Sequence, residues 1–331
     1  MVLAERPRVA GIRPDMVAPP TNASLPKRPV NASPTPRLTG LLHSATARRI
    51  VALLLAITIL ASPSMGAILT SAATATRPGA IVWAVGDIAS CARLSDSKVA
   101  SMIEPRRGTI LTLGDHAYPR GTPDNFANCF DPVWRNLTSR TQPAPGNHEY
   151  ETADAAGYFG YFGDRARNGY YAISRGEWRI YSLNSSVIDQ AQLDWLAADL
   201  TAHPMDCVLA YWHEPLFTSR IDGPSPGVKP FWDLLYAAGA DVVLNGHAHS
   251  YERFAPQTPD GVLADDGIRE FVAGTGGAAA GEFGATAPNS EVQQTGTWGA
   301  LRLRLASGQY SWTFERAAGA VFTDSGTASC H

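Results

Sequence analysis

Residues 109–118 read Thr-Ile-Leu-Thr-Leu-Gly-Asp-His-Ala-Tyr, a short apolar run that ends in glycine and polar side chains. Residues 81–87, Ile-Val-Trp-Ala-Val-Gly-Asp, repeat this arrangement. An apolar run of about five residues bounded by turn residues is typical of a strand that is buried on both faces. The two stretches therefore predict strands of one sheet, each with an aspartate just beyond its end.

Three later stretches end in the same way. Residues 146–149 are Gly-Asn-His-Glu and follow a short proline-flanked segment. The predicted strand 208–212 ends in His213, and the predicted strand 241–244 is followed by Asn-Gly-His-Ala-His at 245–249. Open sheets place their ligand sites at the tips of neighbouring strands. The side chains expected to meet there are Asp87, Asp115, Asn147, His213, His247 and His249.

These side chains offer carboxylate, amide and imidazole donors and no thiolate. Such donors suit two hard or borderline cations such as iron, zinc or manganese. A lone Gly-Asp is usually a turn after a strand, and a lone histidine is usually a polar residue that binds nothing. Five strand ends of this kind in one chain, most of them beside a glycine that lets backbones approach closely, instead predict a metal site.

Further strands and two helices are expected around these motifs. The expected strands are 170–174, 178–183, 271–273, 300–305, 310–314 and 321–322, and the expected helices are 189–200 and 231–238. Leu193, Leu196 and Leu200 would form the buried face of the first helix. Neither an internal repeat nor a second break in composition follows Ala80, so residues 79–331 are expected to form one domain.

Composition separates the first 78 residues from the rest of the 331-residue chain. They carry nine Lys/Arg, two Asp/Glu and ten prolines, whereas all 30 aromatic residues lie at or beyond Trp83. The lack of aromatic side chains predicts that this segment forms no hydrophobic core of its own. The remaining 253 residues have a net charge of −10, which argues against bulk binding to nucleic-acid phosphates. Their aromatic content excludes a coiled coil or a disordered protein.

A leader sequence is expected near the N-terminus. Arg48-Arg49 precede the 12-residue, largely apolar run Ile50 to Ala61, which matches a signal-peptide core better than a membrane span of about twenty residues. Ala73-Thr74-Ala75 offers a cleavage site. An uncleaved signal anchor is the alternative, because no charge interrupts residues 50–76. We expect residues 1–49 to be a disordered, proline-rich basic extension, 50–75 to be the signal peptide or anchor, and the folded domain to be secreted or otherwise extracytoplasmic.

The four cysteines, Cys91, Cys129, Cys207 and Cys330, lie in the part that is expected to be exported. An even number of cysteines in an oxidising compartment predicts disulfides, and no Cys-x-x-Cys motif is present to suggest a thiolate metal site. We favour the pairs Cys91–Cys129, in adjacent loops of the predicted site, and Cys207–Cys330, which would fix the C-terminus. Free buried thiols are the alternative.

Five motifs together resemble those of the calcineurin-like metallophosphoesterase superfamily, and more narrowly those of the purple acid phosphatases. The motifs are Gly86-Asp87, Gly114-Asp115-x-x-Tyr118, Gly146-Asn147-His148-Glu149, His213 and Gly246-His247-x-His249. Ala89 stands where most of the superfamily has a histidine, and Tyr118 follows Asp115 by three residues, as in the purple acid phosphatases. The resemblance implies a mixed α/β (α+β) fold, a four-layer α/β/β/α sandwich of two mixed β-sheets.

The resemblance also implies roles for the site residues. Metal 1 would be held by Asp87, Asp115, Tyr118 and His249, and metal 2 by Asp115, Asn147, His213 and His247. Two carboxylates and a phenolate favour Fe(III) at metal 1, whereas an amide and two imidazoles suit Zn(II), Mn(II) or Fe(II) at metal 2. His148 would be catalytic, stabilising the transition state or protonating the leaving group. The alternative is that His148 only orients the Asn147 loop.

The activity implied is that of an exported di-metal phosphatase, which hydrolyses phosphate monoesters by attack of a metal-bound hydroxide. A phosphodiesterase or nucleotidase with the same metals is one alternative, and a non-catalytic metal- or ligand-binding protein is another. The expected partner is a small phosphate-ester substrate. We expect no bulk nucleic-acid binding, membrane contact only through an uncleaved leader, and a monomer rather than an oligomer.

Three features depart from the pattern or leave it open. Purple acid phosphatases usually carry substrate-binding histidines shortly after the position of His213, but none occurs here between Glu214 and Gly246. Arg220 would either hold the substrate anion in their place or be a solvated loop residue. His116 would support a ligand or be inert, and the glycine-rich stretch 274–284 is expected to be a mobile rim loop.

Overall fold

The computed structural model describes residues 79–331. Strands in this region form two large sheets and one two-stranded ladder. The expected basic extension (1–49) and leader (50–75) lie outside the described residues. Within the described part of the chain, no helix combines the length and the apolar character that a membrane crossing requires.

The first sheet contains the Gly-Asp strands that open the predicted site. Strands β1, β3 and β5 are parallel to one another, and β13 pairs antiparallel with β1 on the other side. A C-terminal meander then extends the sheet through β14 and β15. In order across the sheet, the strands are β15 (Ser325–Ser329), β14 (Gln309–Arg316), β13 (Gly299–Ala306), β1 (Ala80–Val85), β3 (Thr109–Leu113) and β5 (Thr141–Ala144).

The second sheet contains the strands that end in the predicted histidines. Its central strands β7, β8, β9 and β11 are parallel, with antiparallel partners at both edges. In order across the sheet, the strands are β12 (Ser290–Gln294), β10 (Tyr251–Phe254), β11 (Arg269–Ala273), β9 (Val242–Asn245), β8 (Cys207–Tyr211), β7 (Trp178–Ser182) and β6 (Tyr171–Arg175). The expected strands 170–174 and 178–183 are confirmed as the antiparallel pair β6–β7.

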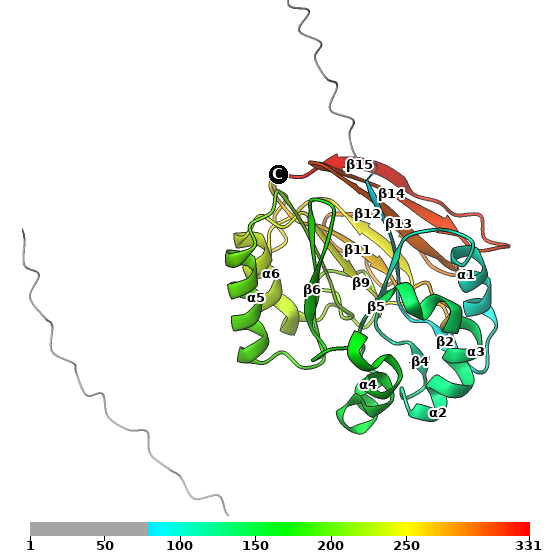
Figure 1. Cartoon of the computed structure of the whole chain (residues 1–331). Coiled ribbons are helices and arrows are strands. Elements are labelled where there is room, and N and C mark those ends of the chain that lie inside the picture. The colour runs from blue at the N-terminus through cyan, green and yellow to red at the C-terminus, as the bar shows by residue number, and fades with distance from the viewer. Residues whose placement is uncertain (1–78) are drawn as a thin grey trace, which may run out of the picture. The chain divides into compact units, whose positions relative to one another are not determined.

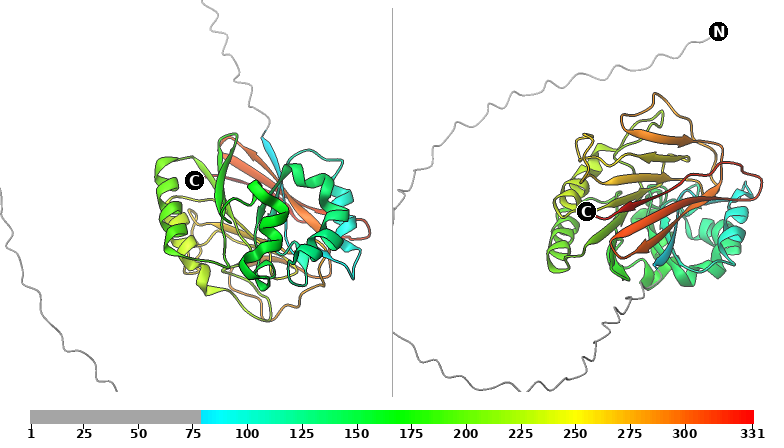
Figure 2. Two further views of the ribbon diagram at one scale, coloured as in Figure 1. Left: turned by 60° about the horizontal axis from the view of Figure 1, so that its bottom comes forward. Right: turned by 90° about the horizontal axis from the view of Figure 1, so that it is seen from above.

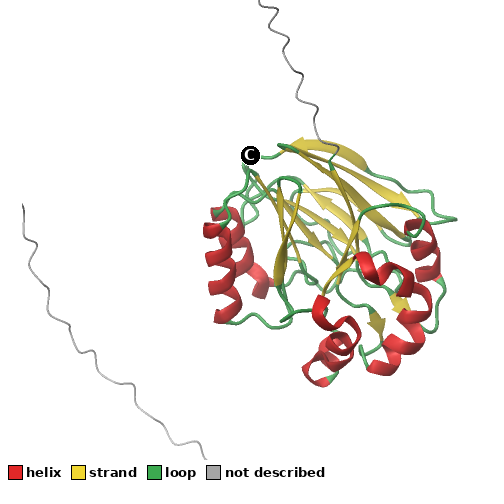
Figure 3. Cartoon of the chain, in the orientation of Figure 1, coloured by secondary structure: helices red, strands yellow, loops and turns green. Residues whose placement is uncertain are grey.

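The two sheets pack face to face, and helices cover their outer faces (Figures 1 and 3). Strand β1 shows how the sequence produces these layers. Val82 and Ala84 point into the core between the sheets, while Trp83 and Val85 point into the core beneath the helices. Because both faces are buried, the strand is apolar throughout. The expected four-layer α/β/β/α sandwich is confirmed.

Each sheet has its own set of helices, which lie apart in the views of Figure 2. Helices α5 and α6 pack on the second sheet, and α1, α3 and α4 on the first. The helices are α1 (Ser95–Ile103), α2 (Pro123–Asn125), α3 (Asp131–Trp134), α4 (Ala156–Phe162), α5 (Gln190–Ala202) and α6 (Lys229–Ala237). Short 3₁₀ turns lie at Arg135–Arg140, Glu149–Glu151, Ala153–Ala155, Gly163–Arg165 and Pro226–Val228, and a π-helical turn, η1, at Phe126–Phe130.

Helix α5 begins and packs as its sequence predicts. The Asp189 side chain accepts a hydrogen bond from the Gln192 backbone N–H and so caps the first turn. Leu196 is fully buried against the second sheet, and Leu193 and Leu200 pack beside it. The expected apolar face is therefore the face that contacts the sheet.

The last strand lies further along the chain than predicted. Residues 321–322 form no strand, and Val321 is 90% exposed. Phe322 instead packs beside Tyr251 and Phe314, as part of a loop. The final strand, β15, is built from small and polar residues, and it is held by backbone pairing with β14. A strand without an apolar pattern gives no periodic signal in the sequence.

Two disulfides join distant parts of the described chain. Cys91 pairs with Cys129 across 38 residues, and Cys207 pairs with Cys330 across 123 residues. The first joins the segment after β1 to the π-helical turn η1, and the second joins the start of β8 to the C-terminus. These are the pairs favoured from the sequence.

Candidate metal centre

The predicted ligands gather at one edge of the two sheets. Asp87 follows β1, Asp115 follows β3, and His213 follows β8. Residues 147–148 follow β5, and His247 follows β9. The two sheets touch here, since the Gly86 N–H, which follows β1 of the first sheet, donates to the carbonyl of Ala273 in β11 of the second. Carboxyl ends of parallel strands from both sheets thus meet at one place.

A short ladder fixes the segments that carry Asp87 and Tyr118. Backbone N–H groups of residues 87, 88 and 89 donate to the carbonyls of residues 114, 115 and 116. The ladder continues as the parallel pair β2 (Ala89–Ser90) and β4 (Ala117–Tyr118). Because Tyr118 belongs to β4, its phenol is directed back toward the carboxylates at the start of the ladder.

Four predicted ligands have a left-handed backbone conformation. The φ angles are 59° at Asp87, 53° at Asp115, 69° at His247 and 51° at His249. A non-glycine residue in this region costs of order 1–3 kcal/mol, and such residues cluster at functional sites where the surrounding structure holds them. Four of the eight non-glycine residues with positive φ in the described part of the chain are therefore predicted ligands.

The first donor group consists of the four residues predicted for metal 1. The Tyr118 hydroxyl lies 3.0 Å from Asp87 Oδ1, 3.0 Å from Asp115 Oδ2 and 2.9 Å from His249 Nε2. His249 Nε2 is also 3.1 Å from Asp87 Oδ1. The phenol has one proton, so it cannot donate to both carboxylates. A cation at this point would satisfy all four donors.

The second donor group consists of the residues predicted for metal 2. His213 Nε2 lies 2.9 Å from Asn147 Oδ1 and 3.2 Å from Asp115 Oδ2. His247 Nδ1 lies 3.1 Å from the same amide oxygen and 3.2 Å from His213 Nε2. Asp115 Oδ2 therefore belongs to both donor groups. Among the described residues, Asp87, Asp115 and His213 also form a cluster compact enough to hold one ion.

Outer hydrogen bonds orient the imidazoles. His213 Nδ1 lies 2.8 Å from the Leu113 carbonyl, and His249 Nδ1 lies 2.8 Å from the Ala279 carbonyl. A ring nitrogen facing a carbonyl must carry the proton, which leaves Nε2 of the neutral ring free to bind a metal. Asp87 Oδ2 accepts from the His247 backbone N–H at 2.8 Å. The carbonyl contacts thus favour a proton on Nδ1 of His213 and His249, the arrangement that metal ligation through Nε2 requires.

Two glycines allow this crowding. A Cβ atom on Gly114, whose φ is +86°, would lie 2.6 Å from His213 Nδ1. A Cβ atom on Gly146 would lie 2.2 Å from Asp115 Oδ1. Any larger residue would push a predicted ligand out of place.

The charges of the site favour a cation. Burial opposes ionisation of Asp115, but the nearby His213 outweighs it and holds the pKa of the carboxyl well below its usual range. Burial likewise opposes charge on His213, yet Asp115 and then Asp87 raise its pKa to about 10. Burial, followed by the two carboxylates, raises the pKa of the Tyr118 phenol well above its usual value. A site that holds protons this strongly also suits a metal cation.

His148 lies beside the donor groups without joining them. Its Nδ1 is 2.6 Å from the Pro119 carbonyl, and its Nε2 is 3.8 Å from Asp115 Oδ2. The ring packs on Tyr118 with centroids 4.7 Å apart, and 29% of the side chain is exposed. The ring therefore reaches both the centre and the solvent.

The residues whose roles the sequence left undecided have defined contacts in the structure. Arg220 Nη1 donates to the His247 carbonyl at 2.8 Å, so the residue is tied to a predicted ligand and is not simply solvated. His116 is fully buried, with its Nε2 2.7 Å from Thr112 Oγ1. The stretch 274–284, expected to be mobile, is anchored to the site by N–H bonds from residues 276, 278 and 281 to the carbonyls of residues 86, 87 and 249.

Sequence reasoning assigned no role to Glu149. Its carboxylate is fully buried and accepts hydrogen bonds from three backbone N–H groups, those of Asp115, His116 and Gly146. The only signal in the sequence was its position in the motif at 146–149, because its partners become neighbours only when β3 and β5 pair.

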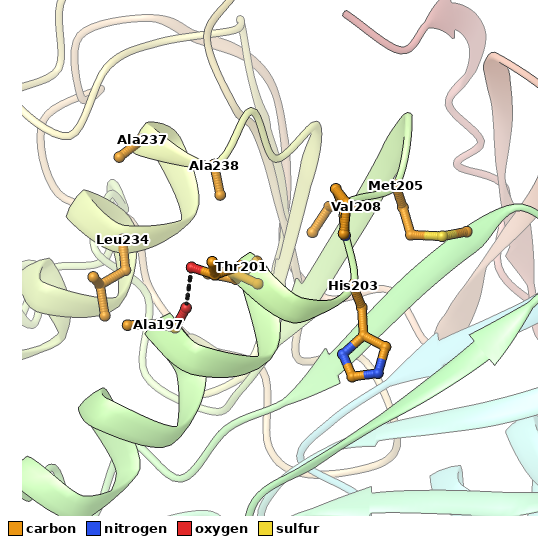
Figure 4. A pocket seen from close by; sticks show the side chains of 10 residues that line it. Ala197, Thr201, His203, Met205, Val208, Leu234, Ala237 and Ala238 are labelled. Carbon is orange, nitrogen blue, oxygen red and sulfur yellow. Dashed lines mark hydrogen bonds between the residues drawn. The ribbon is translucent and has the colours of Figure 1, made fainter.

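The pocket drawn in Figure 4 lies away from these residues. It has a volume of about 350 Å³ and is lined by the C-terminal ends of α5 and α6 and by Val208 at the start of β8. His213 follows the opposite end of that strand. No predicted ligand lines this pocket.

Comparisons with known proteins agree with the geometry. The family model for calcineurin-like phosphoesterases matches residues 81–251. Purple acid phosphatase 15 of Arabidopsis thaliana is 26% identical over 219 residues, which cover 53% of this chain and 41% of that protein. Acid phosphatase type 7 of Homo sapiens is 28% identical over 181 residues, covering 44% of this chain and 41% of that protein. The matches thus span less than half the length of these relatives.

A solved structure gives the same answer for the fold. A purple acid phosphatase isolated from yellow lupin (Lupinus luteus) seeds superposes with a TM-score of 0.63 over 76% of this chain and 53% of that chain, at 18% identity. The family model covers more than half of the 331 residues and contains every predicted ligand. The chain therefore belongs to the calcineurin-like phosphoesterase family.

Proposed function

We propose that the protein is an exported di-metal phosphatase that hydrolyses phosphate monoesters. The observation that carries the proposal is the position of Asp115 Oδ2, within 3.2 Å of donors in both groups. One carboxylate oxygen shared by two donor sets is what a bridging ligand between two cations requires. The acid phosphatases among the relatives support the monoester as the substrate class.

The two donor groups fit different cations. We propose Fe(III) at metal 1, because Asp87, Asp115 and Tyr118 supply anionic oxygen donors, and Zn(II), Mn(II) or Fe(II) at metal 2. When bound, two such cations would acidify a water molecule and neutralise charge on the phosphoryl group. The protein contributes the fixed donor positions and the backbone carbonyls that hold a proton on Nδ1 of His213 and His249.

His148 is proposed as the catalytic residue. Its Nδ1 proton is committed to the Pro119 carbonyl, so Nε2 is the nitrogen that faces the substrate. From this position the ring can hold a hydrogen bond to a phosphoryl oxygen or deliver a proton to the leaving alkoxide. Its partial exposure allows the proton to be exchanged with solvent between turnovers.

A phosphodiesterase and a binding protein remain the alternatives. A diesterase would use the same ligands, and relative rates on a phosphomonoester and a phosphodiester separate the two. A binding protein would need no residue in the position of His148. Export of the folded domain is part of the proposal, and the two disulfides support it, because disulfides persist in oxidising compartments.

Elemental analysis of the purified protein tests the metal centre first. We expect two metals per chain, at least one of them iron, together with hydrolysis of a phosphomonoester. A protein that binds no iron, zinc or manganese after attempted reconstitution would rule out the catalytic proposal. Two metals with no hydrolysis of either ester class would favour the binding protein.

Replacing His148 with alanine is expected to lower kcat by roughly a hundredfold or more while both metals stay bound, because the ring acts on the substrate and not on the metals. Steady-state kinetics and metal analysis of the same preparation check this. His203→Ala, on the surface at the end of α5, is the matched control and should keep full activity. Loss of metal from the His148 variant would instead mean that the residue only orients the Asn147 loop.

A further inference from the structure

Glu149 joins the two loops that carry the bridging ligand and its neighbours. Its Oε2 accepts hydrogen bonds from the Asp115 N–H at 2.9 Å and the Gly146 N–H at 2.8 Å, and its Oε1 accepts from the His116 N–H at 2.8 Å. Residues 115 and 116 lie in the loop after β3, and residue 146 lies in the loop after β5. One carboxylate therefore sets the spacing between two neighbouring strand ends.

The connection between the loops is reciprocal. Glu149 belongs to the second loop and accepts from the first, while Asp115 of the first loop accepts at Oδ1 from the His148 N–H of the second, at 3.0 Å. This contact leaves Asp115 Oδ2 free to face both donor groups. If the two loops moved apart, the bridging carboxylate would rotate and the predicted centre would lose its shared ligand.

Beneath the loops, Glu149 lies in a dry environment. The carboxylate is 3.5 Å from Nδ1 of the buried His116. That ring is surrounded by aromatic side chains of the helical layer, which are Phe126, Phe130, Tyr158 and Phe162. Hydrogen bonds to a charged acceptor are strong where water is excluded, and a backbone N–H left without its acceptor there is costly. The contacts of Glu149 are therefore rigid.

We propose that Glu149 is a positioning residue for the metal centre. It contacts the backbone of Asp115 and not the donor atoms, and it holds that residue in its left-handed conformation, with φ 53°. Through the Gly146 N–H it also fixes the loop that presents Asn147. Both metals depend on this one buried side chain, because the bridging ligand belongs to both donor groups.

Glu149→Gln tests the proposal. The amide places an N–H₂ group against at least one backbone N–H, so one hydrogen bond is replaced by a repulsive contact. Zn(II) affinity, measured on metal-depleted protein by competition with a chromophoric chelator, should fall at least about tenfold, as for other residues that orient metal ligands. Glu149→Asp keeps the charge but is one methylene shorter, and it should restore part of the affinity.

Glu252→Gln is the matched control. Glu252 is also fully buried and accepts hydrogen bonds from the backbone of Ser219 and the side chains of Ser290 and Gln293, outside both donor groups. Both glutamine variants should lower the melting temperature, but only the Glu149 variant should lose Zn(II) affinity. Equal affinity in the two would overturn the proposal.

The other outcomes are also decisive. If the glutamine variant fails to fold, the aspartate variant replaces it, and wild-type Zn(II) affinity in a folded Glu149→Asp protein would overturn the proposal. The proposal rests on the metal centre of the proposed function, but the Zn(II) measurement uses no substrate. A wild-type protein that binds metal but hydrolyses no ester would therefore refute the phosphatase and leave the role of Glu149 intact.

Discussion

Replacing Asp115 with alanine is expected to remove both metals and to lower kcat/KM on a phosphomonoester by at least about a thousandfold, since the proposed two-metal centre would supply most of the rate enhancement. Asp115 Oδ2 lies 3.0 Å from the Tyr118 hydroxyl and 3.2 Å from His213 Nε2, so its loss affects both donor groups at once. Asp87 also contacts the second group, but it does so through the backbone N–H of His247 and not through a ring nitrogen.

The effect of Asp115→Ala should exceed that of changing a ligand to one metal. Asn147→Ala removes a donor from the second group only, so metal 1 should stay bound. Metals per chain, counted by elemental analysis, should therefore be near zero for Asp115→Ala and near one for Asn147→Ala.

Asp199→Asn is the matched control for this prediction. Asp199 is a largely buried carboxylate on α5 that forms an ion pair with Arg179, and its removal changes the same charge at a distance from the donor groups. This variant should keep both metals. Two metals retained in Asp115→Ala would show that the carboxylate is not a bridge, and the shared-ligand argument would fail with it.

That the predicted ligands lie close together could be foreseen from the sequence, because each lies one to three residues beyond the end of a strand, except Tyr118 and His249. A run such as residues 81–85 is visible as a strand, and the strand ends must meet once the sheet forms. The position of Tyr118 within the site came from the resemblance, because no predicted strand precedes it directly. His249 lies four residues after β9 and was predicted together with His247 from the strand before them. Local signals and a recognised motif together were enough to predict which side chains the structure brings together.

The supporting contacts could not be predicted, because they join segments whose proximity only the fold determines. Glu149 binds N–H groups 33 and 34 residues earlier in the chain. The stretch 274–284 looks flexible in sequence, since glycine permits many backbone conformations. It is held instead by backbone bonds to Gly86 and Asp87, which carry no side-chain signal. Backbone-to-backbone partners across a fold are the contacts that sequence patterns describe least well.

The Cys207–Cys330 disulfide is expected to contribute more stability than any single side chain near the site. In the chain-entropy account, closing a loop of 123 residues stabilises the folded state by about 5 kcal/mol, and a loop of 38 residues by about 4 kcal/mol. The double variant Cys207→Ser/Cys330→Ser should therefore lose more free energy of unfolding than Cys91→Ser/Cys129→Ser. Denaturant titration of the metal-free proteins measures both values.

For metal affinity, the two disulfide variants should rank in the opposite order from their free energies of unfolding. Cys91 lies four residues after Asp87, at the end of the ladder that aligns the Asp87 segment with Tyr118. Opening this disulfide loosens the first donor group, so metal 1 affinity should fall. Cys207 and Cys330 lie at the other end of β8 from His213, so their loss should leave both metals bound. If the more destabilised variant also bound metal more weakly, global stability would explain the metal affinity, and the ladder would have no separate role.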